Sequence, residues 1–112
     1  MTDPGIRQIT IKTGIVKRLR KEEAMYITEV KEQEEKIERL KAQAEDVYVI
    51  KKQIEVLQES KMMIPDTRRR LATAHGDLEQ TLESYESLAE TEQYKEARHI
   101  LESLKLDAGC SP

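Results

Sequence analysis

The segment that decides the fold is IKKQIEVLQESKMMIPDTRRRLATAHGDLEQTLESY, residues 50–85. Its apolar side chains recur every seven residues without a gap, which places them on one face of a helix. The series is Ile50, Leu57, Ile64, Leu71, Leu78 and Tyr85, flanked by Val47, Ile54, Ala74 and Leu82. The pattern predicts a long amphipathic helix over about residues 47–86.

Pro65 lies inside this predicted helix. Proline lacks a backbone donor and disfavours helical geometry at the preceding residue, so a kink or a break is expected there. Because the apolar phase continues on both sides of Pro65, we expect a kink, with both halves of the helix on one seam.

Two further helices are expected around this one. The first spans about residues 4–44, with Asp3 and Pro4 at its start. The third spans about residues 91–106, with Thr91 as its cap and a flexible tail at 107–112. Asp46 is the predicted cap of the middle helix. The first seam, interrupted by Glu23 and Gln33, contains Ile9, Val16, Val30, Ile37 and Ala44, and the third contains Tyr94, Ala97, Leu101 and Leu104.

The predicted fold is therefore all-α: one domain over residues 1–112, an elongated antiparallel three-helix bundle with two long helices and a shorter third. The third helix is too short to cover the whole hairpin made by the other two. One end, roughly residues 22–44 with 47–65, should be a bare two-helix hairpin. Its groove, with Ile27, Val30 and Ile54, would be open to a partner unless Lys and Arg stems shield it.

The composition of the chain disfavours several classes of function. The chain has 112 residues, 37% of them charged, and a net charge of −3, which disfavours binding to nucleic acid through bulk electrostatics. It has a single cysteine, Cys110, and lacks an apolar run of the roughly 20 residues that a membrane span needs. No signal peptide is evident, so a cytoplasmic location is expected.

No catalytic, metal-binding or cofactor-binding pattern is found. His75 and His99 fall on different predicted helices, the glycines are isolated, and the carboxylates are spread over solvated faces. The sequence therefore predicts a binding protein without a cofactor and not an enzyme.

Several residues of the middle helix are candidate contacts for a partner. Arg68, Arg69 and Arg70 could form a docking patch, or could point in three directions around the helix. Met62 and Met63 could form an adaptable contact surface, or could fill gaps beside the kink. Pro65 would contribute through the curvature that it imposes.

The ordered series of short segments resembles the tubulin-binding cofactor A family. The segments that carry the resemblance run in register from about residue 3 to 106. They are Asp3-Pro4, Arg7-Gln8-Ile9, Ile11-Lys12-Thr13-Gly14, Val16-Lys17-Arg18-Leu19, Met25-Tyr26, Gln33-Glu34-Glu35-Lys36-Ile37-Glu38, Ile50-Lys51-Lys52-Gln53, Leu57-Gln58-Glu59-Ser60, Met62-Met63-Ile64-Pro65-Asp66, Arg69-Arg70-Leu71 and Tyr94-Lys95-Glu96-Ala97-Arg98.

The resemblance implies a chaperone that captures β-tubulin folding intermediates after their release from the chaperonin. It would hold them non-covalently before transfer to other tubulin-folding cofactors, and it would be cytoplasmic and cytoskeleton-associated. Tyr94, Lys95 and Arg98, from the last resembling segment, complete the candidate contacts. A monomer is expected, with a weak homodimer as the alternative.

The competing hypothesis from the residues alone is a coiled-coil scaffold or adaptor that tethers other proteins. It would require an obligate parallel dimer, and Pro65 and the change of phase near Asp46 count against it.

Overall fold

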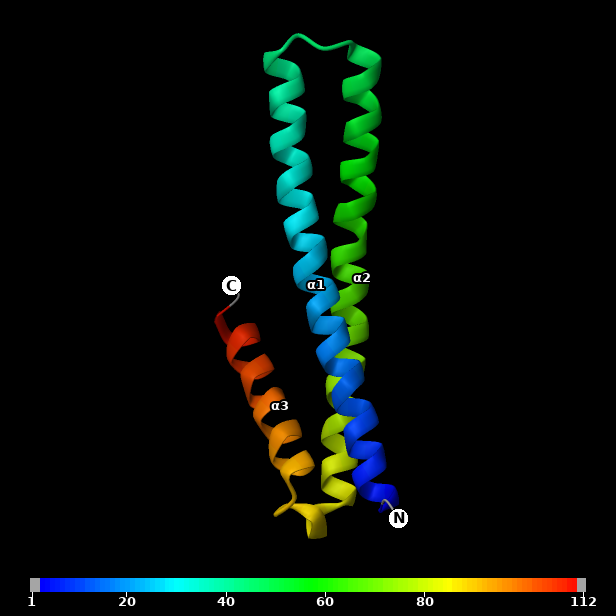
Figure 1. Ribbon diagram of the computed structural model, residues 1–112, viewed down its shortest axis with the longest axis vertical. Coiled ribbons are helices and arrows are strands. Elements are labelled where there is room, and N and C mark those ends of the chain that lie inside the picture. Colours follow the sequence, from blue (N-terminus) through cyan, green and yellow to red (C-terminus); the bar gives the residue numbers. More distant parts are fainter. Residues whose placement is uncertain (1–2, 111–112) are drawn as a thin grey trace. The chain divides into compact units, whose positions relative to one another are not determined.

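The structure is a computed structural model that describes residues 3–110, with side chains described up to residue 104. Three α-helices follow one another along the chain: α1 at Pro4–Ala42, α2 at Val47–Ser84 and α3 at Glu92–Cys110 (Figure 1). A short 3-10 helix, η1, at Glu86–Leu88 lies between α2 and α3. Residues 3–110 contain no strand, and the predicted all-α fold is confirmed.

Each α-helix begins at the side chain that the sequence indicates. The Asp3 carboxylate accepts a hydrogen bond of 2.7 Å from the Gly5 backbone N–H, and the Asp46 carboxylate accepts one of 2.7 Å from Tyr48. The Thr91 hydroxyl oxygen accepts one of 3.3 Å from the Tyr94 N–H. These bonds satisfy backbone donors that have no partner within the first helical turn.

The turn between α1 and α2 is closed by backbone hydrogen bonds. The Glu45 N–H donates to the Leu40 carbonyl at 3.0 Å, and the Ala44 N–H donates to the Lys41 carbonyl at 3.1 Å. This is the Schellman arrangement, which needs a left-handed residue at its centre. Ala44 occupies that position with φ of 53°, where glycine is usual. The chain therefore reverses direction without Gly or Pro.

The other boundaries differ from the expected ones by a few residues. α1 ends at Ala42 and α2 ends at Ser84, each two residues earlier than expected. α3 continues to Cys110, past the start of the expected tail at 107, because a single Gly109 costs a helix only about 1 kcal/mol. Residues 111–112 of that tail lie outside the described residues. α2 continues through Pro65 and does not break there.

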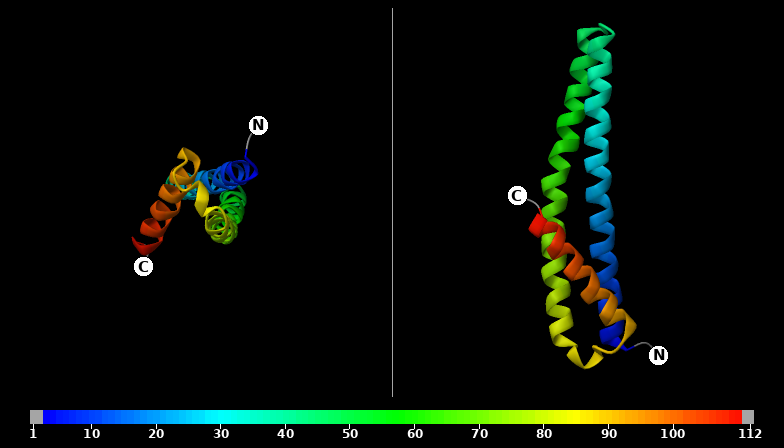
Figure 2. Two further views of the ribbon diagram at one scale, coloured as in Figure 1. Left: turned by 90° about the horizontal axis from the view of Figure 1, so that it is seen from below. Right: turned by 90° about the vertical axis from the view of Figure 1, so that its left-hand side faces the viewer.

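The chain divides into two compact units. The first, called here the three-helix unit, combines residues 1–18 with 70–112, and the second, called the hairpin unit, is residues 19–69. Both long helices contribute to both units. Within each unit, the segments of α1 and α2 run antiparallel and side by side, as two views agree (Figures 1 and 2). The hairpin unit contains both segments of the predicted hairpin, residues 22–44 and 47–65.

The three-helix unit contains a closed core drawn from all three helices. Ile9 and Val16 of α1, Leu78 and Leu82 of α2, and Leu101 of α3 are almost completely buried. Lys12 connects two helices at the edge of this core, because its ammonium donates to Asp77 at 3.2 Å and to the Thr81 hydroxyl at 2.9 Å. Lys17 forms an ion pair with Glu96 of α3.

Gly5 allows a close approach between segments of this unit. A Cβ atom at Gly5 would lie 2.6 Å from the Tyr85 Cδ1 and 2.7 Å from the Leu88 Cδ1. These distances are well below van der Waals contact, so any larger residue would push the aromatic ring and the leucine away. The start of α1 therefore packs tightly against the connection between α2 and α3.

Candidate partner-binding surface

The hairpin unit carries most of the large apolar side chains that are exposed among the described residues. Two helices can bury only the stripes that face each other, so apolar side chains beside those stripes stay in contact with water. Among the described residues, eight of the nine exposed large apolar side chains belong to this unit. They are Met25, Ile27, Val47, Tyr48, Val49, Val56, Met62 and Met63.

Polar pairs interrupt the interface between the two helices of the hairpin unit. The Gln33 side-chain amide donates to the Gln53 backbone carbonyl at 3.1 Å and to the Gln53 side-chain oxygen at 2.7 Å. The Arg68 guanidinium Nε donates to the Glu23 carboxylate at 3.0 Å. Each residue that interrupts the apolar seam of α1 therefore has a polar partner on α2. Such pairs fix which residues of the two helices face each other, at some expense of apolar burial.

A groove of about 520 Å³ lies along one side of this hairpin. Val56 and Ser60 of α2 line it on one side, and α1 lines it on the other. The α1 residues are Glu29, Glu32, Gln33, Glu35, Lys36 and Arg39. The groove thus combines an apolar contact with carboxylates toward one end of the α1 segment and cations toward the other.

The predicted groove residues lie in the hairpin unit. Val30 and Ile54 are half-buried, and Ile27 is exposed. None of the three lines the groove of about 520 Å³ described above. The hairpin unit therefore has a groove, but its lining consists of side chains other than these three.

The residues around the proline are also exposed. Met62 is 71% exposed and Met63 is 36% exposed, and Pro65 is exposed as well. Met62 and Met63 are consecutive, so they point to different sides of α2. The two methionines therefore belong to different surfaces of the helix.

The three arginines do not form one uncommitted patch. Arg68 pairs with Glu23 of α1, and Arg69 pairs with Asp66 one turn before it at 3.3 Å. Arg70 is exposed and belongs to the three-helix unit, whereas Arg68 and Arg69 belong to the hairpin unit. The guanidinium groups of Arg68 and Arg69 thus have intramolecular carboxylate partners that an acidic partner would have to replace.

The three candidate residues of α3 lie in the three-helix unit, and one of them is buried. Tyr94 is only 7% exposed, so its ring is part of the core and cannot offer a docking surface. Arg98 covers it, with its guanidinium 5.7 Å from the ring centroid and donating to the phenol oxygen at 3.3 Å. Lys95 is exposed and lies 3.8 Å from the Glu90 carboxylate. The interpretation of Tyr94 as a contact residue is therefore corrected: its 3–4 spacing with Ala97 and Leu101 marks the core.

A second apolar track on α2 lies outside the predicted seam. Val49, Val56 and Met63 are spaced by seven residues and share one face of the helix, beside the Ile50–Leu57–Ile64 seam. The signal was present in the sequence, but the stronger neighbouring seam obscured it. Val56 is the member that lines the groove.

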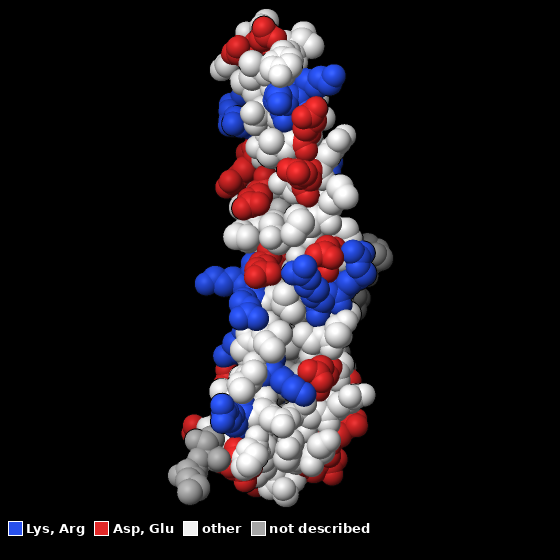
Figure 3. All heavy atoms as spheres, turned by 90° about the vertical axis from the view of Figure 1, so that its right-hand side faces the viewer, with Lys and Arg blue, Asp and Glu red and all other residues white. Residues whose placement is uncertain are grey.

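The described residues hold no arrangement for a metal or a membrane span. No group of three or more His, Cys, Asp or Glu side chains among them could hold a metal ion. In the same part of the chain, no helix is long and apolar enough to cross a membrane. What the described surface offers is mixed charge around apolar stripes, and Figure 3 shows acidic and basic side chains interspersed with uncharged ones on the face that it displays.

Comparison with known proteins gives consistent matches. Residues 4–101 match the family described as "Tubulin binding cofactor A". The "Tubulin-specific chaperone A" of Gallus gallus is 65% identical over 108 residues, which cover 96% of this chain and all of that protein. The solved structure of "human tubulin chaperone cofactor a" superposes with a TM-score of 0.76 at 57% identity, covering 91% of this chain and 99% of the other. The crystal structure of tubulin folding cofactor A from Arabidopsis thaliana gives a TM-score of 0.81 at 36% identity, covering 90% and 95%.

Proposed function

Because this chain belongs to the tubulin-binding cofactor A family, a family of tubulin chaperones and not of enzymes, we propose that it captures and holds β-tubulin folding intermediates. Binding is non-covalent and follows release of β-tubulin from the chaperonin. The chain keeps the intermediate available for other tubulin-folding cofactors, which it meets only indirectly. It acts in the cytoplasm, in association with the cytoskeleton that its client builds.

The observation that carries this proposal is the exposed apolar surface of the hairpin unit. A folding intermediate of β-tubulin presents a surface that will later be buried against its partner subunit. The hairpin unit offers apolar side chains in narrow stripes between charged ones, so it can cover such a surface without forming a permanent interface. Ile27, Met62 and Met63 are proposed contacts because they are exposed there.

We propose that the chain acts as a monomer. The scaffold hypothesis needs the apolar seam of α2 for pairing with a second chain. Leu71, Leu78 and Leu82 of that seam and its flank are buried within the chain itself. A parallel coiled coil would have to expose them first. Sedimentation equilibrium at micromolar concentration should give the mass of one chain, and an obligate dimer would favour the scaffold.

The test uses the tubulins at the stage that the proposal names. β-Tubulin bound to the cytosolic chaperonin is released with ATP in the presence of the purified chain, and the products are separated by gel filtration. We expect β-tubulin to elute in a complex with the chain. α-Tubulin released in the same way should elute without it. Co-elution of both tubulins to the same extent would contradict the β-tubulin specificity, and co-elution of neither would contradict the proposal.

A further inference from the structure

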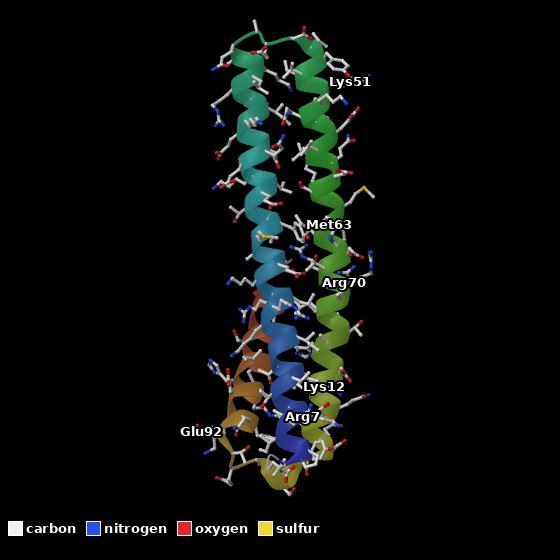
Figure 4. The ribbon with its side chains drawn as sticks, turned by 45° about the vertical axis from the view of Figure 1, so that its right-hand side comes forward. Arg7, Lys12, Lys51, Met63, Arg70 and Glu92 are labelled. Atoms are coloured by element: carbon white, nitrogen blue, oxygen red, sulfur yellow. The ribbon has the colours of Figure 1, made fainter. Side chains whose placement is uncertain are left out.

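The second apolar track of α2 is confined to the hairpin unit. Val49, Val56 and Met63 are 38%, 46% and 36% exposed, so each presents part of its side chain to solvent on the same helical face. The next position in the series is Arg70, at the start of the three-helix unit segment (Figure 4 labels Met63 and Arg70 on α2). Apolar character at this spacing therefore ends where the hairpin unit ends.

The groove beside this track has a defined charge pattern. On α1, Glu29 and Glu32 line one end of it, and Lys36 and Arg39 line the other. The segment from 29 to 39 is about 15 Å long at 1.5 Å per residue, which matches about three turns of a second helix. The groove is thus long enough for an entire short helical segment.

Several charged side chains of the groove form no ion pair with each other in the described part of the chain. Glu32 and Lys36, and Glu35 and Arg39, have the spacing of favourable intrahelical ion pairs. In the described part of the chain, however, neither pair comes within 4.0 Å, and the ion pairs nearby join Lys41 to Glu38 and Arg68 to Glu23. Four charges lining the groove are therefore available to groups from outside.

The three-helix unit shows how this chain accommodates an additional helix. α3 buries Tyr94, Ala97 and Leu101 at 3–4 spacing, and its Glu96 forms an ion pair with Lys17 at the edge. In that unit, α3 is held by an apolar stripe in the middle of the contact and by a complementary charge at its side. The hairpin unit presents the same two elements, an apolar stripe and open charges, without a helix of its own to cover them.

We propose that the groove between Glu29–Arg39 of α1 and the Val49–Val56–Met63 track of α2 docks an amphipathic helix of the client. That helix has apolar residues at 3–4 spacing, cations where it faces Glu29 and Glu32, and anions where it faces Lys36 and Arg39. The inference rests on the proposed function, because it assigns the contact surface for β-tubulin. An extended strand is disfavoured, since its side chains alternate every two residues and would place every second one away from the track.

The first experiment measures β-tubulin binding to substituted chains. Val56→Lys should weaken binding about tenfold or more, because a charge would lie in the apolar contact. Ile11→Lys is the matched control: Ile11 is also exposed, but it belongs to the three-helix unit, and its substitution should change affinity less than about twofold. Circular dichroism checks that both variants keep their helices. If wild type binds and Val56→Lys binds equally well, the groove is not the site, while the proposed function stands. If wild type itself fails to bind, the proposed function fails.

Charge reversal tests the acidic end of the groove. Glu29→Lys combined with Glu32→Lys should weaken binding about fivefold or more, with a larger effect at low salt. Glu34→Lys combined with Glu38→Lys is the control, since it changes the net charge equally on another face of α1. Equal effects of the two double variants would show a general response to charge and would overturn the assigned face.

Photocrosslinking identifies the occupant. A benzophenone amino acid at position 56 should react with one segment of β-tubulin, located by mass spectrometry, whose apolar residues have 3–4 spacing and are accompanied by Lys or Arg. The same label at position 11 should give no such product. Crosslinking to a segment with two-residue alternation, or crosslinking from position 11 alone, would overturn the helix-docking proposal.

Discussion

The two units are built from the same two long helices, yet they differ in what they bury. Of the eleven buried apolar residues among those described, nine belong to the three-helix unit and only Leu19 and Ile37 belong to the hairpin unit. The seven-residue seam of α2 passes through both without a change in its spacing. Leu78 is 0% exposed in one unit, whereas Leu57 is half-buried in the other. Burial is thus decided by whether a third helix is present and not by the pattern of the segment itself.

The largest expected change in the free energy of unfolding comes from shortening a leucine side chain of the α2 seam, and its size should differ between the two units. Leu78→Ala should lower the free energy of unfolding by about 2–5 kcal/mol, because it leaves a cavity in a closed core. Leu57→Ala should lower it by only about 1–2 kcal/mol, because part of that side chain is already in water. Urea denaturation measures both, with Glu83→Ala as an exposed control that should change little. Equal losses at Leu78 and Leu57 would mean that the two units are equally packed.

Pro65 is a second feature that should make the hairpin unit less stable than the three-helix unit. It removes a backbone donor from the interior of α2, and its exposed ring gains little burial in return. Pro65→Ala should therefore raise the free energy of unfolding by up to about 3 kcal/mol. Hydrogen exchange should show the gain as slower exchange of amides in residues 58–66. A loss of stability would instead indicate that α2 needs the proline to fit against α1.

Substitution of the two glycines of α1 by alanine should change the stability of the protein in opposite directions. Gly5→Ala should lower stability by about 1–3 kcal/mol, because the new methyl group would collide with Tyr85 and Leu88. Gly14→Ala should raise it by about 1 kcal/mol, because no atom beyond the adjacent backbone of its own helix lies within 4 Å of the added carbon and alanine favours a helix. Thermal unfolding followed by circular dichroism separates the two. Stabilisation by both substitutions would show that the end of α1 is not held tightly against the connection between α2 and α3.

The smallest expected change in the free energy of unfolding comes from a substitution in the turn between α1 and α2, in the hairpin unit. Ala44→Gly should raise the free energy of unfolding by about 0.5–1 kcal/mol, because glycine adopts the left-handed conformation without steric conflict. Ala42→Gly, at the last residue of α1, should lower it by a similar amount. A stability loss with Ala44→Gly would argue against the left-handed conformation at this residue.

Much of the fold follows from local signals in the sequence. The seam at residues 50–85 predicts α2, and the caps Asp3, Asp46 and Thr91 begin the three helices as expected. These signals act within one or two turns, so they can be read without knowledge of distant residues. The exact end of α1 could not be predicted, because Ala44 is an uncommon residue for the left-handed position that closes the turn.

The candidate site was harder to predict, because it depends on pairs of residues far apart in the sequence. Glu23 and Gln33 look like defects in the seam of α1 until Arg68 and Gln53 are placed opposite them, 45 and 20 residues away. Tyr94 looks like a contact residue until the core of the three-helix unit is assembled around it. Val56 is one of many apolar residues in α2, and only the position of α1 beside it makes it part of a groove.

The division of the chain also has a consequence for its synthesis on the ribosome. The hairpin unit is one continuous stretch, so all its residues have emerged once residue 69 has left the exit tunnel, and its contacts are local. The three-helix unit joins residues 1–18 to residues 70–112. The start of α1 therefore has no packing partners from this unit's other segments until most of the chain has been synthesised. Vectorial synthesis therefore completes the less buried unit first and the closed core last. Throughout that interval Ile9 and Val16 lack the complete core that buries them in the finished unit.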